Sequence, residues 1–141
     1  MPAEKVNIVI IGGGQAGVAL SGHLARSGVD HVVLEKNRIA EEWRTARWDS
    51  LVANGPAWHD RFPDKTFDDC GGDDFATKDG CARYFEDYVG EHKLPVRTGV
   101  TVHRAAHDPD GGYIVETSAG AIHAANIVAA TGPFQDPVIP P

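Results

Sequence analysis

Apolar residues follow a pattern that predicts a strand, a helix and a second strand near the start of the chain. Residues 6–11 are almost continuously apolar, and the shorter apolar run 31–35 ends in Glu35; such runs are typical of strands buried in a parallel sheet. Between them, residues 15–27 carry apolar side chains four positions apart, which predicts a helix with one apolar face toward the sheet. The residues of this face are Ala16, Leu20 and Leu24. Gly28 then supplies a stop for the helix, and the order is that of a βαβ unit.

The rest of the chain predicts a second long helix and further strands. Residues 37–74 show poor periodicity and are expected to be mostly irregular, with one short helix near 39–47. Residues 78–94 predict a helix capped by Thr77, because apolar side chains recur at spacings of three and four. These side chains are Cys81, Tyr84, Phe85, Tyr88 and Val89. Turn residues then separate predicted strands at 95–102, 113–117, 121–122 and 127–130, the last of them typical of a buried parallel strand.

The six residues 12–17 join the first predicted strand to the first helix and spell G-x-G-x-x-G. Gly12 allows a sharp exit from the strand, Gly14 lets the backbone approach a pyrophosphate, and Gly17 lets the helix lie close to the strand. The helix directs its unpaired N–H groups at the phosphates. Glu35 lies eighteen positions after Gly17, where a carboxylate accepts hydrogen bonds from a ribose diol. The motif alone leaves NAD and FAD open, as well as a glycine-rich turn without a ligand.

Composition excludes several classes of function. The chain has 141 residues and a formal net charge of −7, which argues against nucleic acid or an anionic membrane as the main partner. Cys70 and Cys81 form neither a disulfide framework nor a C-x-x-C redox motif. The seven histidines have no metal-ligand spacing, so no metal is expected. We find no signal peptide and no apolar stretch of transmembrane length, so a cytoplasmic location is expected.

The order of elements, with a three-stranded β-meander before the final strand, resembles the amino-terminal part of the flavin-containing monooxygenases and their Baeyer–Villiger and flavin-oxidoreductase relatives. The resemblance covers almost all residues and is most specific at the glycine motif with Glu35, at Trp43, at residues 47–51 leading to Asn54, and at residues 130–133. It implies an α/β, Rossmann-like FAD/NAD(P)-binding domain over residues 1–141, with a parallel sheet, helices and the meander. In that family the first glycine motif holds FAD and a later one holds NADPH. The resemblance therefore implies FAD as the ligand of residues 12–17.

The resemblance also implies roles for single residues. Trp43 matches a tryptophan close to the flavin, although an aromatic residue there is equally typical of core packing. Asn54 matches an asparagine near the reactive face of the flavin and is the implied catalytic residue, whereas Asn54-Gly55 is also a strong turn signal. Val102 falls at the end of the predicted strand whose backbone contacts adenine in such proteins. The expected cofactor-binding residues are Gly12, Gly14, Gln15, Ala16, Gly17, Glu35, Lys36, Trp43, Arg44, Val102, Thr131 and Gly132.

The expected function is that of the FAD-binding portion of a flavin-dependent, NADPH-using monooxygenase that acts on a small-molecule substrate with O2. The family continues into a nicotinamide-binding domain and a return strand, so the chain is expected to be a fragment that is inactive alone. Two alternatives remain open at this point. One is a reductase that uses FAD or NAD without oxygenation, and the other is a non-catalytic dinucleotide-binding or interaction module. A homodimer through the face left by truncation is a further expectation.

Overall fold

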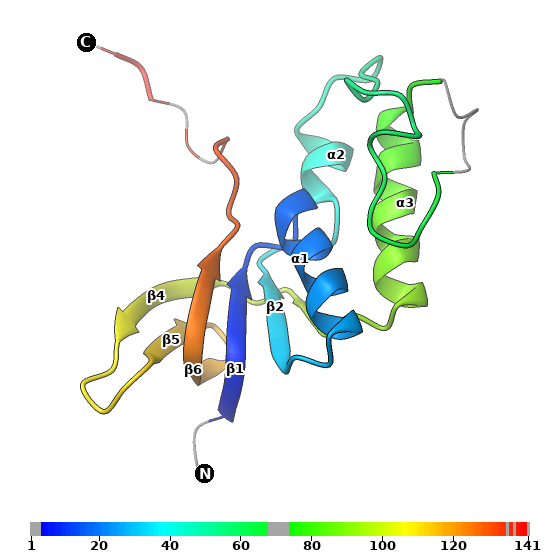
Figure 1. The fold of residues 1–141 in the computed structure, drawn as a ribbon. Helices are drawn as coiled ribbons and strands as arrows, with labels where there is room; N and C mark the ends of the chain where they lie inside the picture. Colours follow the sequence, from blue (N-terminus) through cyan, green and yellow to red (C-terminus); the bar gives the residue numbers. More distant parts are fainter. Residues whose placement is uncertain (1–3, 68–73, 135, 137, 141) are drawn as a thin grey trace.

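The computed structural model describes residues 4–67, 74–134, 136 and 138–140 and contains one mixed sheet of six strands (Figure 1). The strand order is β3-β2-β1-β6-β5-β4, parallel from β3 to β6 and antiparallel from β6 to β4. The strands are β1 (Glu4–Ile11), β2 (His31–Glu35), β3 (Val96–Thr98), β4 (Val102–His107), β5 (Tyr113–Thr117) and β6 (Gly120–Ala129). The predicted Rossmann-like α/β fold with a three-stranded meander is confirmed.

Three helices lie together beside β1 and β2: α1 (Gln15–Arg26), α2 (Glu41–Thr45) and α3 (Lys78–Glu91). The predicted cap is confirmed, because the Thr77 hydroxyl accepts a hydrogen bond from the Gly80 N–H at 3.1 Å. The predicted apolar face of α3 is buried at Cys81, Tyr84, Phe85 and Tyr88. Phe62 packs its ring against three of these side chains, so the irregular segment after α2 is anchored to α3.

The prediction for the buried face of α1 is wrong. Ala16 is exposed and Leu20 and Leu24 are only half-buried, whereas the buried residues are Gly17, Val18, Ser21 and Gly22. The physical reason is close backbone packing. A Cβ on Gly17 would lie 2.0 Å from the Gly12 carbonyl oxygen, and one on Gly22 would lie 2.1 Å from Tyr88 Oη. Helix α1 therefore packs against its neighbours through its smallest residues. The spacing of apolar side chains does not predict such a face.

The predicted strands of the meander need two corrections. Residues 121–122 and 127–130 were expected as separate strands, but β6 is continuous, because it pairs antiparallel with β5 and parallel with β1. The predicted strand 95–102 ends as β3 at Thr98, since Gly99 has φ +71 and turns the chain. Strand β4 then begins at Val102 and was not predicted as a strand. The side chains of β4 are mostly exposed, so the sequence shows no alternation of apolar residues there. The strand is defined by its hydrogen bonds with β5.

Some expectations concern features that the described residues address only in part. Within them, no helix combines the length and the apolar character needed to cross a membrane. Across the same part of the chain, no group of three His, Cys, Asp or Glu side chains is arranged to hold a metal ion. Cys81 is buried. Cys70 lies outside the described residues.

Candidate dinucleotide-binding site

The candidate site lies where β1 and β6 end side by side. Strand β1 pairs in parallel with β2 on one side and with β6 on the other. Open α/β sheets bind ligands outside the carboxyl ends of their parallel strands. The Gly12 N–H donates to the Leu34 carbonyl at 2.9 Å, and the Ala130 N–H donates to the Ile11 carbonyl at 2.8 Å. Backbone hydrogen bonds therefore hold the glycine turn and the turn after β6 next to each other.

The three glycines of the motif meet different surroundings. Gly12 has φ +109, and a Cβ there would lie 2.4 Å from the Ala130 carbonyl oxygen. Gly17 lies against the Gly12 carbonyl, as described above. Gly14 differs, because a Cβ at this position would meet no atom of the described residues within 4 Å, apart from its own chain neighbours and helix. Packing within the chain thus explains why Gly12 and Gly17 lack side chains, whereas open space at Gly14 leaves room for a close ligand.

The amino-terminal end of α1 offers donors to that open space. Gly14 is the N-cap residue, and within the described part of the chain no side chain caps this helix. The first turn contains no acidic residue, and Gln15 and Ala16 are exposed. The N–H groups and the positive end of the helix dipole are therefore available to an anion such as a pyrophosphate. Gly14, Gln15 and Ala16 are placed as the sequence predicted.

Glu35 ends β2 beside this turn and has a role that the sequence did not predict. Its Oε2 accepts a hydrogen bond from the Gly13 N–H at 2.8 Å, and its Oε1 accepts one from the Asn37 N–H at 2.8 Å. The half-buried carboxylate therefore fixes the glycine turn itself. A carboxylate has about four acceptor positions, so each oxygen retains one for a ribose hydroxyl. Lys36 follows as an exposed residue.

Of three further predicted residues, Thr131 and Gly132 follow β6 beside the glycine turn, whereas Val102 does not lie where it was predicted. Gly132 has φ +73 and follows Thr131 in the turn after β6, beside Gly12. Val102 was predicted at the end of a strand, but it is the first residue of β4 and pairs with Thr117. The chain reaches Glu35 earlier, through the Val100 N–H, which donates to the Glu35 carbonyl at 3.0 Å. The turn at Gly99 causes this difference.

Arg44 of helix α2 and Arg47, which follows the helix, both contact other segments of the chain. Arg44 forms a 2.6 Å ion pair with Glu86 of α3, so α3 already holds this predicted cofactor-binding residue. The Arg47 guanidinium lies 5.9 Å from the centroid of the Trp43 ring and 5.6 Å from that of Phe134. Phe134 follows the Thr131 turn closely in sequence, so Arg47 connects α2 to that turn. This contact was not predicted from the sequence, although the Trp-Arg and Arg-Trp pairs of residues 43–48 were a signal for cation–π contacts.

Asn54 lies in an exposed bend of the segment that follows α2. In the described residues its side chain makes no hydrogen bond, so the amide is available to a ligand. Its neighbour Ala53 is buried in the same core as Ile39, and Ile39 lies 3.1 Å from the place of a Cβ on Gly13. Core packing thus joins the Asn54 segment to the glycine turn, while the structure brings no ligand-binding atom of Asn54 into direct contact with that turn.

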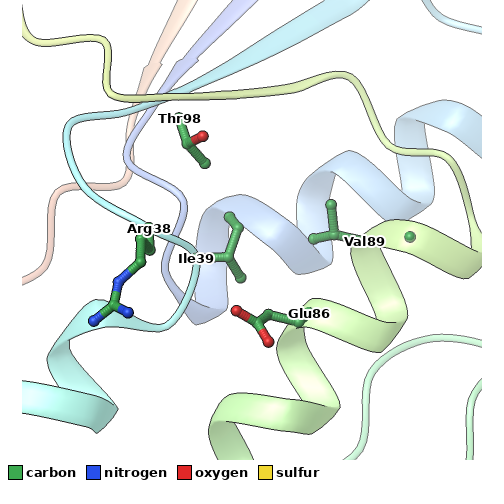
Figure 2. A pocket seen from close by; sticks show the side chains of 6 residues that line it. Arg38, Ile39, Glu86, Val89 and Thr98 are labelled. Atoms are coloured by element: carbon green, nitrogen blue, oxygen red, sulfur yellow. The ribbon is translucent and has the colours of Figure 1, made fainter.

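A cavity of about 340 Å³ opens beside the loop after Glu35 (Figure 2). Its lining residues are Arg38, Ile39, Glu86, Val89, Gly90 and Thr98. Arg38 and Glu86 supply charges, but each is paired, Arg38 with Glu41 at 2.6 Å and Glu86 with Arg44. The cavity is therefore mainly an apolar recess behind the loop, between β3 and α3.

Comparison with protein families matches residues 9–141 to the model described as pyridine nucleotide-disulphide oxidoreductase. The chain belongs to this family. Among curated relatives, an uncharacterized CzcO-like oxidoreductase of Geobacillus kaustophilus is 37% identical over 138 residues, which are 96% of this chain and 38% of the relative. The indole-3-pyruvate monooxygenase YUCCA6 of Arabidopsis thaliana is 32% identical over 94% of this chain and 33% of the relative.

Solved structures agree with this assignment. A flavin-containing monooxygenase from Stenotrophomonas maltophilia superposes with a TM-score of 0.79 and 28% identity, over 92% of this chain and 39% of that structure. The chain spans less than half the length of each of these relatives. The resemblance to flavin monooxygenases is confirmed, and the chain is an oxidoreductase-family FAD/NAD(P)-binding domain with a Rossmann-like fold.

Proposed function

We propose that this chain binds FAD at the glycine turn and is the FAD-binding portion of a flavin-dependent, NADPH-using monooxygenase. The observation that carries the proposal is the combination of open space at Gly14, an uncapped α1 and a Glu35 carboxylate fixed beside them. These features suit the pyrophosphate and ribose of an adenine dinucleotide. FAD is favoured over NAD because the relatives include flavin monooxygenases.

The residues fit FAD in the following way. The first turn of α1 would bind the pyrophosphate, and Glu35 would accept hydrogen bonds from the ribose. Trp43, Arg44, Val102, Thr131 and Gly132 would surround the rest of the cofactor, with Lys36 beside the ribose. Asn54 would lie near the reactive face and supply an amide donor and acceptor there. Bound FAD would supply the electron transfer from NADPH to O2 that oxygenates a small-molecule substrate.

A reductase that does not oxygenate its substrate is the second candidate, and the family description favours it. The chain offers no cysteine pair for a disulfide-reducing mechanism, because Cys70 and Cys81 are its only cysteines and ten residues separate them. Oxygen insertion and plain reduction differ in the fate of electrons taken from NADPH. A longer protein that converts NADPH and O2 into peroxide alone, with no oxygenated product among candidate substrates, would favour the reductase.

The direct test is a visible spectrum of the purified chain after addition of FAD and removal of the excess. A retained flavin absorption band is the expected result, with a stoichiometry near one. A parallel titration with NADH provides the comparison. A folded chain that retains no flavin but binds NADH would overturn the FAD assignment and leave the dinucleotide site intact.

A further inference from the structure

Asp60 closes a short loop that begins at Asn54. Its Oδ2 accepts a hydrogen bond from the Gly55 N–H at 2.9 Å, and its Oδ1 accepts one from the His59 Nδ1–H at 2.7 Å. The N–H groups of His59 and Asp60 both donate to the Pro56 carbonyl, at 2.9 and 3.1 Å. One carboxylate therefore holds both ends of the loop.

Gly55 makes this closure possible for reasons of space. A Cβ at position 55 would lie 2.4 Å from Asp60 Oδ1, so any side chain would displace the carboxylate from the Gly55 N–H. Gly55 does not have a positive φ, and its backbone conformation alone does not require glycine. The contact with Asp60 thus requires a glycine at position 55. Because Asn54 directly precedes Gly55, this contact also restrains the backbone of Asn54.

The same carboxylate sets the state of the His59 ring. Because Asp60 is an acceptor, the neutral ring carries its proton on Nδ1, and Nε2 is left as an acceptor. The His59 side chain is 68% exposed, and the Trp58 ring meets it edge-on at 5.7 Å. The loop therefore presents an exposed amide at Asn54 and an oriented imidazole acceptor at His59.

The loop belongs to the ligand-binding side of the sheet. The segment after α2 lies beyond the arrowheads of β1 and β2, the side on which the glycine turn opens (Figure 1). Ala53 and Ala57 flank the start of the loop, and both are buried in the core that contains Ile39 and Val18. This core anchors the loop to α1, whose first turn carries the candidate pyrophosphate site.

We propose that Asp60 is a positioning residue for a polar wall of the flavin site formed by Asn54 and His59. The inference rests on the proposed FAD binding and extends it to residues that lie beyond the adenine half of the ligand. Asp60 acts through its two partners and touches no ligand itself. It fixes the backbone that carries Asn54 and selects the His59 tautomer. The flavin ring then meets polar groups that are already ordered, which lowers the entropic cost of binding.

The experiment compares Asp60→Ala and Asp60→Asn with the unaltered chain. Asparagine keeps an oxygen for the Gly55 N–H but turns its NH₂ toward His59, which moves the ring proton to Nε2. Alanine removes both contacts. We expect Asp60→Ala to weaken FAD binding about tenfold and to leave ADP binding unchanged within twofold, because ADP lacks the flavin ring. Asp60→Asn keeps the loop closure but reverses the His59 tautomer, so it should weaken FAD binding by a smaller factor, about threefold, and leave ADP binding unchanged.

Two further measurements separate positioning from simple loss of structure. The ¹⁵N chemical shifts of the His59 ring should show the Nδ1–H form in the unaltered chain and the Nε2–H form in Asp60→Asn. Exchange of the Gly55 amide should be at least tenfold faster in Asp60→Ala and unchanged in Asp60→Asn. Asp49→Asn is the matched control, because it removes an exposed carboxylate paired with Lys78 in the same region; it should change none of these values.

The outcomes distinguish this inference from the proposed function. If the unaltered chain binds neither FAD nor ADP, the proposed function fails first. If it binds FAD and Asp60→Ala binds FAD equally well, the positioning role is refuted while the function stands. Equal weakening of FAD and ADP would also refute it, because the loop would then act on the adenine half or on the whole fold. Should Asp60→Ala not fold, an unchanged His59 tautomer in Asp60→Asn decides against the proposal.

Discussion

Substitution of Gly14 by valine separates ligand binding from folding more cleanly than other changes in the glycine motif. A Cβ on residue 14 would meet no atom of the other described segments within 4 Å, and φ −82 suits any residue. The folded chain should therefore accept valine, at the cost of about 0.5–1 kcal/mol for a poor N-cap residue. The side chain would, however, occupy the place where a pyrophosphate approaches the first turn of α1.

The expected loss of affinity follows from the contacts that this displacement breaks. Hydrogen bonds to a charged group contribute about 1.5–3 kcal/mol each, so the loss of one or two gives about 3 kcal/mol. That free energy corresponds to a Kd about a hundredfold higher. Gly17→Ala is the counterpart, because its Cβ would meet the Gly12 carbonyl at 2.0 Å and the neighbouring atoms are backbone. Overpacking of this kind costs about 1–3 kcal/mol or more of folding stability.

The assay combines thermal unfolding with a fluorescence titration of FAD for each variant. Gly14→Val should lower Tm by only a few degrees and abolish measurable FAD binding at micromolar concentrations. Gly17→Ala should lower Tm by clearly more, and any loss of FAD binding should accompany the loss of fold. Retention of FAD by a folded Gly14→Val chain would refute the position of the pyrophosphate, whatever Gly17→Ala does.

Three further predictions concern single side chains. Glu35→Ala should weaken FAD binding at least tenfold in the same titration, and unchanged affinity would contradict the ribose assignment. It should also lower the free energy of unfolding by about 2 kcal/mol, because two backbone N–H groups lose their acceptor. Tyr84→Phe should cost about 1–3 kcal/mol in urea unfolding, because the buried Phe62 N–H donates to the Tyr84 hydroxyl at 2.8 Å; a neutral effect would show that water replaces the hydroxyl. Burial raises the pKa of Tyr88 above its ordinary value near 10, so the folded chain keeps a proton that the unfolded chain releases. The contribution of Tyr88 to stability should thus be full below pH 10 and be lost as pH rises through the folded pKa. Tyr88→Phe should remove this part of the fall in Tm between pH 9 and 11. If Tm falls with pH equally steeply in both chains, Tyr88 is excluded as the cause.

Features that depend on local spacing were predicted correctly from the sequence. The βαβ unit, the cap at Thr77 and the buried face of α3 each follow from residues close together in the chain. Contacts between distant segments decided the rest. Helix α1 turns its glycines inward because Gly22 meets Tyr88, and β6 is continuous because β1 and β5 lie on its two sides. Neither neighbour can be inferred from the residues of α1 or β6 alone.

The candidate site shows the same division. The placement of Gly14 and Glu35 at the glycine turn was predictable, because the dinucleotide-binding motif puts these residue types at this spacing. The contact of Glu35 with Gly13 was missed, since it joins residues 22 positions apart through a carboxylate assigned to a ligand. The contact of Arg47 with Phe134 was missed because it connects segments separated by more than half the length of the chain.

These contacts imply that the two halves of the proposed ligand meet surfaces of different construction. The glycine turn is held by backbone hydrogen bonds from Gly12 and Ala130 and by the Glu35 carboxylate, so the adenine half meets a surface fixed by the sheet itself. The surface for the flavin half would instead consist of side chains on segments outside the sheet, among them the loop that Asp60 closes. Substitutions at the glycine turn should therefore weaken the binding of every adenine dinucleotide equally. Substitutions at Asp60 should weaken the binding only of ligands that carry a flavin ring. A variant that breaks this pattern would show that the two surfaces are coupled through the shared core.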